Sequence, residues 1–483
     1  MSLETVDKVK NSGKIYTPTP IVKLMLDYSG YVPGEYIKKK HVIDNSCGDG
    51  QILCEVVERY IQSCGVIDNV LEDLSTYIHG IELDEIEVEL CKSNLNKVLR
   101  KYGFKNVDWD IRCGNSLTVN EFNGKMDFVI GNPPYVRMKN IKKYDGKNDN
   151  YQIIKNYKFS AKGMSDLYLA FYELGLRMLN SNGILCYIAP STWINSSSGE
   201  PMRNHIWNER DLSGVIDFEH IQVFENAQTY VMIALFDKKT HNYIRYDKFS
   251  PDGNRFVPVS ALTYDEVFIG GKMYFSSPEE CQLIKAVAEP HTQKVEVKNG
   301  YATLADDIFI DNLPEFNEYT IPILKGSTGQ WKKCLFPYDR NLKLIPLEKI
   351  KETSQDVYDY LMLNNEKLKS RTYDCKDNER STMDVWHCIG RSQGLKDTFV
   401  DRIGLNSIVK CPDDLKIIPI KSGEGIYSGL YIKTDLPLKT IEDVLKTWDF
   451  IEYVKSLRKY KSGGYYTFSS NDVENYINYK LSI

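Results

Sequence analysis

The chain has 483 residues and a net charge of −5; 42% of its residues are hydrophobic and 26% are charged. This length predicts two or three domains, each with a real hydrophobic core. The sequence has no apolar run long enough to span a membrane, and its 11 cysteines follow no disulfide or metal-ligand spacing. We also expect no secretory leader. Membrane proteins and disulfide-rich secreted proteins are therefore excluded, and we expect a cytoplasmic protein without a metal site.

The first predicted elements are a helix that begins near Pro20 and a strand over residues 41–44. The strand runs into a turn over residues 44–50, and a second helix follows. Gly48 and Gly50 let the backbone turn tightly and approach a ligand. Alone, such a turn is weak evidence for a ligand site, because most glycine turns are only structural.

Two further predicted strands each end in polar groups. Residues 77–83 read as a strand that ends in Glu82, directly before a helix. An acid at this place in a Rossmann-like unit can bind two ribose hydroxyls, although it can also be simple helix N-terminal charge. Residues 109–117 read as the next strand, with Asn115 and Ser116 at its end.

The tetrapeptide Asn132-Pro133-Pro134-Tyr135 follows an apolar strand over residues 126–131 and is the strongest functional signal. An aromatic amine is a weak nucleophile because its lone pair is delocalised, and two acceptors aimed at its N–H groups free that lone pair. Asn132 can supply its side-chain oxygen and Pro133 its main-chain carbonyl, while Tyr135 can stack on a base. Taken without its context, the tetrapeptide can also be a proline-rich structural turn.

These polar groups follow successive strands, and the predicted strands alternate with helices. Because the carboxyl ends of parallel strands meet at one edge of a sheet, the pattern predicts a Rossmann-like α/β domain with a mostly parallel sheet. One ligand would lie across the strand ends. The order of contacts suits a nucleoside with a charged tail, with the tail at the glycine turn, the ribose at Glu82 and the base near Asn115.

These motifs resemble those of gamma-type N6-adenine DNA methyltransferases, the group that contains the TaqI methylase. In that group a cofactor segment comes first, here Tyr16-Thr17-Pro18, followed by the glycine turn, the Asn-Pro-Pro-Tyr motif and target recognition. Residues 166–168, 183–193 and 221–227 match later family segments. The resemblance covers residues 16–236 and implies a seven-stranded sheet and S-adenosylmethionine as the cofactor.

The resemblance also implies the roles of individual residues. Phe224 matches the aromatic residue that closes the second face of a flipped base, although it can also be a core aromatic. The implied catalytic residues are Asn132, Pro133, Pro134, Tyr135 and Phe224. The implied cofactor-binding residues are Tyr16, Thr17, Pro18, Asp44, Ser46, Gly48, Gly50, Glu82, Leu83, Asn115, Ser116 and Asn132.

The sequence departs from the family pattern at four positions. Asn45 and Ser46 stand where the glycine turn usually has Pro and Ala, Asp49 replaces a small residue, and Asn115 replaces an Asp. An Asn oxygen can still accept the cofactor's adenine amine, without the charge. These changes leave the attacking site intact, so we expect an active enzyme.

The predicted domains are residues 1–244, for catalysis, and 245–483, a mixed α+β target-recognition domain. Segments 300–304, 307–310, 319–326, 386–393 and 463–470 resemble recognition domains of restriction-system adenine methyltransferases. Arg and Gln side chains in segment 386–393 suit the edges of guanine and adenine, although phosphate contacts and structural roles compete. Two basic stretches, which can also be solvated faces, supply further candidates. The candidate DNA contacts are Arg137, Lys139, Arg391, Gln393 and Lys459.

The resemblance implies a site-specific adenine-N6 DNA methyltransferase that acts on a flipped-out adenine in duplex DNA, in a prokaryotic restriction-modification system. Because the cofactor segment lies within the first twenty residues, we expect any restriction endonuclease on a separate chain. Because the long N-terminal helical module of multisubunit modification subunits is missing, we expect a monomer that acts alone. The alternatives are a methyltransferase for RNA or for protein glutamine, and a non-catalytic DNA-binding protein with the same fold.

Overall fold

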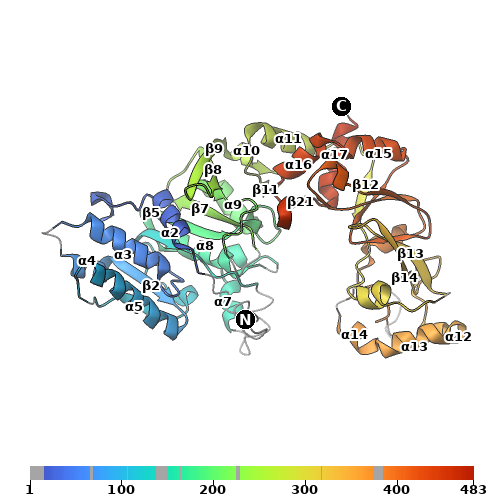
Figure 1. The fold of residues 1–483 in the computed structure, drawn as a ribbon, viewed down its shortest axis with the longest axis horizontal. Helices are drawn as coiled ribbons and strands as arrows, with labels where there is room; N and C mark the ends of the chain where they lie inside the picture. Colours follow the sequence, from blue (N-terminus) through green and yellow to red (C-terminus); the bar gives the residue numbers. More distant parts are fainter. Residues whose placement is uncertain are drawn as a thin grey trace. The chain divides into compact units, whose positions relative to one another are not determined.

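The computed structural model describes residues 16–65, 69–105, 107–137, 149–163, 165–224, 229–316, 318–371, 373 and 385–482. The chain divides into two compact units between Gln282 and Leu283, and each unit has its own sheets and core (Figure 1). No helix in these described ranges is both long enough and apolar enough to cross a bilayer.

The first unit is an open α/β structure with helices on both faces of one large sheet. Its helices and strands are α2 (Thr19–Ser29), β1 (Val42–Asp44), α3 (Gln51–Ser63), α4 (Val70–Tyr77), β2 (Ile78–Glu82), α5 (Glu85–Lys101), β3 (Asp110–Cys113), β4 (Met126–Gly131), α7 (Asp149–Lys155), α8 (Leu167–Met178), β5 (Leu179–Pro190), α9 (Glu200–Glu209), β6 (Leu212–Asp217), β7 (Val231–Asp237), β8 (Tyr243–Ser250), β9 (Arg255–Thr263), α10 (Tyr264–Val267), β10 (Phe268–Ile269), β11 (Lys272–Met273) and α11 (Pro278–Ala288), which crosses the division.

The large sheet has the strand order β3-β2-β1-β4-β5-β7-β6-β8-β9. From β3 to β5 all neighbours are parallel, whereas β7 runs antiparallel to both β5 and β6. The chain adds strands on one side of β1 and then on the other, so the switch point lies between β1 and β4. A ligand crevice is expected there, outside the carboxyl ends of the strands.

The sheet is larger than the seven strands predicted. β8 is parallel to β6, from the pair Gly214 and Arg245 onward, and β9 forms an antiparallel hairpin with β8. The predicted boundary at residue 245 therefore falls inside β8, and the first compact unit continues to Gln282. The predicted boundary was wrong because it was placed where strands stop alternating with helices. At that point the chain forms the β8–β9 hairpin, and backbone hydrogen bonds from β8 to β6 keep this hairpin in the first sheet.

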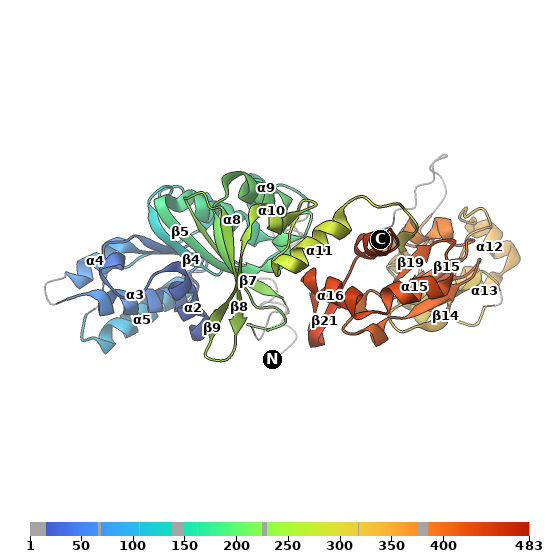
Figure 2. The same ribbon diagram turned by 90° about the horizontal axis from the view of Figure 1, so that it is seen from above.

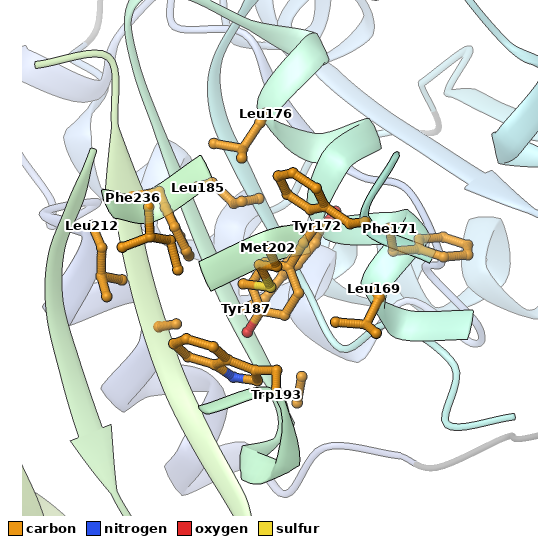
Figure 3. Packing of buried hydrophobic residues seen from close by; sticks show 14 of the residues in the cluster. Leu169, Phe171, Tyr172, Leu176, Leu185, Tyr187, Trp193, Met202, Leu212 and Phe236 are labelled. Carbon is orange, nitrogen blue, oxygen red and sulfur yellow. The ribbon is translucent and has the colours of Figure 1, made fainter. Parts of the chain in front are cut away.

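Successive residues of the central strands point to opposite faces of the sheet, as strand geometry requires. Val42 and Phe128 pack with α2, α3 and α5 in one buried cluster, and Ile43 and Val129 pack with α8 and α9 in the other. Figure 2 shows these two groups of helices on opposite faces of the sheet. The α8 side is rich in large aromatic side chains, including Tyr172, Tyr187 and Trp193, which are fully buried (Figure 3). Two covered faces explain why these strands read as continuous apolar runs.

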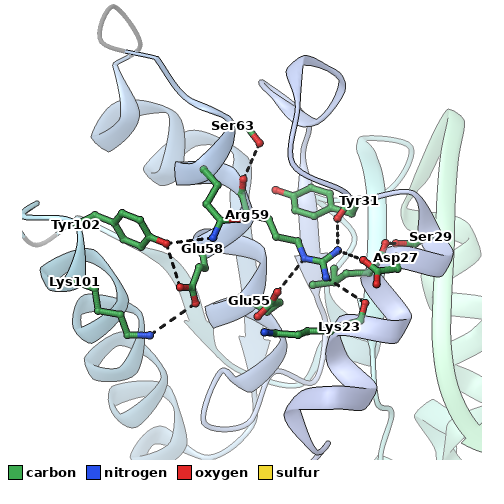
Figure 4. Close-up of polar contacts among 12 residues, drawn as sticks. Lys23, Asp27, Ser29, Tyr31, Glu55, Glu58, Arg59, Ser63, Lys101 and Tyr102 are labelled. Carbon is green, nitrogen blue, oxygen red and sulfur yellow. Dashed lines mark hydrogen bonds and ion pairs between the residues drawn. The ribbon is translucent and has the colours of Figure 1, made fainter. Parts of the chain in front are cut away.

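Arg59 on α3 holds α2 in place (Figure 4). Its guanidinium donates to Asp27 Oδ1 at 2.7 Å, to the Tyr31 carbonyl at 2.9 Å and to Glu55 Oε1 at 3.0 Å. A further bond reaches the Lys23 carbonyl at 3.3 Å. The bonds to Asp27, Tyr31 and Lys23 join α3 to α2 and the residues that follow it, whereas the bond to Glu55 lies within α3.

The second unit combines helices with three small sheets, of strand orders β12-β19-β15-β17, β14-β13-β18 and β16-β21-β20. All neighbours are antiparallel except β13 and β18. Its elements are β12 (Glu296–Asn299), β13 (Thr320–Lys325), β14 (Gln330–Leu335), α12 (Leu347–Thr353), α13 (Gln355–Leu363), α14 (Asn365–Ser370), β15 (Arg402–Leu405), β16 (Ile408–Val409), β17 (Ile417–Ile420), β18 (Gly425–Tyr427), β19 (Leu430–Lys433), α15 (Leu438–Leu445), α16 (Trp448–Ser456), β20 (Tyr460–Lys461), β21 (Tyr465–Thr467) and α17 (Ser470–Lys480).

Candidate active site and second-unit cleft

Three predicted site segments meet at Asn132, directly after β4. The Asn132 Nδ2 donates to Thr17 Oγ1 at 3.1 Å, and its main-chain oxygen accepts from Ser46 Oγ at 3.4 Å. Thr17 is buried and lies just before α2, while Ser46 belongs to the turn after β1. The segments are 115 and 86 residues away in sequence, and the tertiary fold brings them together.

Glu82 connects the end of β2 to the glycine turn. Its Oε2 accepts from the Gly48 N–H at 3.0 Å, and its Oε1 accepts from the N–H groups of Leu83 and Asp84 at 2.8 and 3.1 Å. A carboxylate has about four lone-pair sites, so capacity for a ligand hydroxyl remains. Leu83 beside it is 69% exposed and offers an apolar surface to a ligand ring.

The glycine turn has the backbone geometry that its sequence predicted. Gly48 and Gly50 have φ values of 50° and 85°, in the left-handed region that favours glycine. At Gly50, a Cβ would lie 2.6 Å from Cys91 Sγ, so the turn also needs the missing side chain. Burial raises the pKa of the Asp44 carboxyl to about 7, and the charge of Glu82 adds to this rise.

Asn115 and Ser116, after β3, have partners within the protein. The Asn115 Oδ1 accepts from the Leu117 N–H at 3.1 Å and caps a short 3-10 turn, Ser116–Thr118. The buried Ser116 hydroxyl donates to the Asn45 carbonyl at 2.6 Å. Ser116 therefore connects the loop after β3 to the glycine turn after β1.

The first predicted cofactor segment leads into α2. Tyr16 is about half exposed, and its hydroxyl donates to Glu87 Oε1 on α5 at 3.1 Å. The Pro18 carbonyl accepts the first helical N–H bonds, from Ile21 and Val22. Tyr16 Cε1 lies 3.9 Å from the Cβ position of Gly48, so its ring borders the glycine turn.

Tyr135 and Phe224 contact each other edge to face. Their ring centroids are 6.0 Å apart with an interplanar angle of 68°, and the Tyr135 hydroxyl donates to the Ile188 carbonyl at 3.1 Å. A base stacked between two rings needs parallel planes about 7 Å apart, twice the contact distance of carbon atoms. Phe224 is buried among core residues, as the alternative interpretation expected, and its role against a base stays a prediction.

The predicted DNA contacts differ in what surrounds them. Arg137 is 81% exposed, 4.0 Å from Asp166 Oδ1, whereas Lys459 forms an ion pair with the buried Asp472. Lys139 lies outside the described residues. In the second unit, Arg391 is exposed and pairs with the backbone of Ala302; Gln393 Nε2 donates to the Gly300 carbonyl at 2.9 Å.

A cleft of about 1050 Å³ opens within the second unit. Its lining includes residues 300–304, Asp307, Gln393 and Tyr465, which come from the predicted recognition segments, whereas the described segment 319–326 contributes no lining residue. Leu304 is 49% exposed and has a φ of 57°, a conformation that leucine rarely adopts. Strained, exposed residues of this kind concentrate at functional sites.

The charged side chains of the cleft differ in whether they have a hydrogen-bond or ion-pair partner. Asp306 accepts a bond from Thr303, Asp307 pairs with Lys367, and Asp414 accepts the N–H groups of residues 410 and 411. Lys416 forms no ion pair with any residue that the structure describes. The cleft therefore contains the Lys416 ammonium group beside apolar and aromatic side chains. Against the effect of burial, the N–H bonds from residues 411 and 410 and the charge of Lys416 together lower the pKa of the neighbouring Asp414.

Sequence reasoning missed several residues around both sites. Asn45 was noted only as a departure from the family pattern, and Tyr187 reads as part of an apolar strand. Lys416 carries no pattern of its own, because its place in a cleft depends on segments far apart in the chain. Leu304 lies in the predicted segment 300–304, but its exposure and backbone strain were not predicted. The sequence offered one indication of the role of Asn45, namely a polar amide shortly before the two glycines of the turn.

Comparison with known proteins identifies relatives of this chain. The Eco57I restriction-modification methylase family model matches residues 71–224. Type II methyltransferase M.BstVI of Geobacillus stearothermophilus is 27% identical over 343 residues, covering 62% of this chain and 60% of that protein. Modification methylase CviBIII of Paramecium bursaria Chlorella virus NC1A is 32% identical over 211 residues, covering 42% of this chain and 44% of that protein.

The fold is also found in a solved structure. The Type IIL restriction-modification enzyme MmeI, solved in complex with DNA, superposes with a TM-score of 0.58 and 13% identity, covering 97% of this chain and 65% of that one. This chain spans 60%, 42% and 40% of three curated type II methyltransferase relatives. It is thus related to the Eco57I-type restriction-modification methylases, in agreement with its resemblance to the gamma-type enzymes.

Proposed function

We propose that the protein is a site-specific DNA adenine-N6 methyltransferase that uses S-adenosylmethionine. The single observation that carries the proposal is the meeting of Thr17, Ser46 and Asn132 at the switch point of the sheet. An Asn-Pro-Pro-Tyr loop held between two cofactor segments suits transfer of a group from one ligand to the amine of another. Its relatives' names, which specify methyltransferases, support the same reaction class.

The residues at the strand ends fit the cofactor. The Glu82 carboxylate can accept from ribose hydroxyls, and the exposed Leu83 can pack on the adenine ring. The buried Asp44 can attract the cationic tail, because ionisation of this carboxyl is favoured by a nearby positive charge. When bound, S-adenosylmethionine supplies an electrophilic methyl group on a sulfonium.

The loop after β4 provides for the amine. The Thr17 hydroxyl holds Asn132 Nδ2, which directs the other amide atom, Oδ1, away from Thr17. Asn132 Oδ1 and the Pro133 carbonyl accept the two N–H bonds of the adenine amine, and this favours its nucleophilic form. Tyr135 stacks on the flipped base, and stacking is worth roughly 1–3 kcal/mol against the cost of unstacking from the duplex.

The cleft of the second unit is the proposed surface for target recognition. Lys416 supplies a charge for phosphate, and Leu304, Ile408 and Tyr465 supply partly exposed apolar and aromatic surface. Phosphate contacts would position the duplex, while contacts to base edges would select its sequence. Double-stranded DNA is thus the proposed partner, and a separate restriction endonuclease the proposed companion.

The test is expression in a host that lacks adenine methylation, followed by single-molecule sequencing that detects modified bases. Methyladenine at one consensus motif is the expected result. The matched control is Asn132→Ala, which should still bind S-adenosylhomocysteine but leave the genome unmodified. Full modification by Asn132→Ala would overturn the proposed role of the amide. An unmodified genome with the wild-type protein would overturn the proposal that duplex DNA is the substrate.

A further inference from the structure

A buried hydrogen bond joins Asn45, in the turn after β1, to Tyr187 on β5. The Tyr187 hydroxyl donates to Asn45 Oδ1 at 2.8 Å, and both residues are fully buried. Tyr187 points into the aromatic cluster on the α8 side of the sheet (Figure 3). A buried hydrogen bond of this kind is costly to break, because loss of one partner leaves the other polar atom buried without that bond.

Asn45 is the centre of a set of contacts between four strand ends. Its carbonyl accepts from Ser116 Oγ at 2.6 Å, and its Nδ2 lies 3.7 Å from Met178 Sδ at the end of α8. The next residue, Ser46, donates to the main-chain oxygen of Asn132. The turn after β1 is therefore connected to β3, β4 and β5 at once.

The ring of Tyr187 occupies a slot made by two glycines. A Cβ on Gly131 would lie 3.1 Å from Tyr187 Cε1, and a Cβ on Gly175 would lie 2.9 Å from its hydroxyl oxygen. Gly131 is the last residue of β4 and directly precedes Asn132. The ring thus packs against the backbone that carries the Asn-Pro-Pro-Tyr loop, while the hydroxyl holds the glycine turn.

We propose that Tyr187 is a positioning residue that keeps the glycine turn and the Asn132 loop at a fixed separation through its hydrogen bond to Asn45. The inference rests on the proposed function. The turn holds the methyl donor and the loop holds the amine, and transfer requires reacting atoms about 3–3.5 Å apart in line. Proline at position 45, usual in the gamma-type enzymes, stiffens the turn through its ring; here the side-chain hydrogen bond takes that role.

The test compares Tyr187→Phe with Tyr172→Phe. Tyr172 is a matched control because it is also fully buried, its ring lies 5.3 Å from that of Tyr187, and its hydroxyl has no hydrogen-bond partner among the described residues. The readouts are the affinity for S-adenosylhomocysteine by calorimetry, kcat and KM for methylation of the consensus duplex, and the thermal midpoint of each variant.

We expect Tyr187→Phe to weaken S-adenosylhomocysteine binding about fivefold and to lower kcat about tenfold, with KM for DNA unchanged. Tyr172→Phe should change each quantity less than about twofold. Asn45→Leu breaks the same bond from the other side and should match Tyr187→Phe. The double variant should lose no more than either single variant, because both act on one interaction. Should Tyr187→Phe fail to fold, Asn45→Leu carries the comparison.

Two results would overturn the inference alone: equal behaviour of Tyr187→Phe and Tyr172→Phe, or fully additive losses in the double variant. A wild-type protein that binds no S-adenosylhomocysteine would overturn the proposed function, and the inference with it. The calorimetric titration of the wild-type protein therefore separates the two failures before any variant is measured.

Discussion

The side chain of Asn132 donates a hydrogen bond from Nδ2 to Thr17 Oγ1, over 3.1 Å. This bond joins the loop after β4 to the segment before α2, across 115 residues of sequence. It also sets the orientation of the amide, because the two ends of an Asn side chain differ only in which one donates. Thr17 therefore acts on the proposed reaction through Asn132.

Replacement of Thr17 by Val tests this relationship. Val has the shape of Thr without the hydroxyl, so the Asn132 amide loses its partner while packing is kept. The expected loss is about 1 kcal/mol of transition-state stabilisation, or roughly fivefold in kcat. Steady-state methylation kinetics measure it, and Thr17→Ser, which keeps the hydroxyl, should retain most of the rate. Equal kcat for Thr17→Val and the wild-type protein would contradict the role of Thr17.

Asp44 predicts a pH dependence of stability. Burial raises the pKa of its carboxyl from 3.8 to about 7 in the folded protein. Between these values the folded state holds a proton that the unfolded chain has released, so the free energy of unfolding falls as pH rises. The slope is at most about 1.4 kcal/mol per pH unit, and the loss is complete above pH 7.

Asp44→Asn isolates this effect, because an amide oxygen can still accept from the Ser46 N–H. Urea unfolding at pH 4.5 and 7.5 should show a smaller stability difference for Asp44→Asn than for the wild-type protein. The same difference in both proteins would show that Asp44 ionises in the folded state as it does in the unfolded chain.

If Lys416 contacts a phosphate, its substitution should change the salt dependence of DNA binding. Removal of one phosphate contact should reduce the slope of log affinity against log salt by about 0.9. Fluorescence anisotropy with the consensus duplex, at several salt concentrations, measures the slope for Lys416→Ala. Lys439→Ala is the matched control, because Lys439 is exposed on α15 and pairs with Asp443 within its own helix. Equal slopes for the two variants would remove Lys416 from the proposed recognition surface.

We expect substitution of Arg59 to lower the free energy of unfolding by more than the loss of a surface ion pair does. Arg59→Met keeps the apolar stem but leaves Asp27, Glu55 and two carbonyls without their donor. The expected cost is about 3 kcal/mol, measured by urea unfolding as the transition of the first unit. Lys92→Met, which breaks only an exposed pair with Glu89, should cost less than about 1 kcal/mol. Similar costs for the two variants would contradict the anchoring role of Arg59.

The sequence by itself determined several local features of the first unit. Gly48 and Gly50 predicted a left-handed turn, and the run from Met126 to Gly131 predicted a buried strand that ends before Asn132. Both are local, because backbone freedom and alternation of apolar residues need no distant partner. The adjacent motifs also predicted a parallel sheet core, which is present from β3 to β5.

Only the tertiary structure decided what each polar side chain contacts. Lys459 lies in a basic stretch, yet its ammonium pairs with Asp472, and Gln393 holds the Gly300 carbonyl. The hairpin β8–β9 belongs to the first unit because its ladder continues the large sheet. Asn45 and Tyr187 are 142 residues apart, and their bond exists because parallel strands bring distant segments to one edge of a sheet. Such pairings depend on the register of whole strands, which no local pattern of residues encodes.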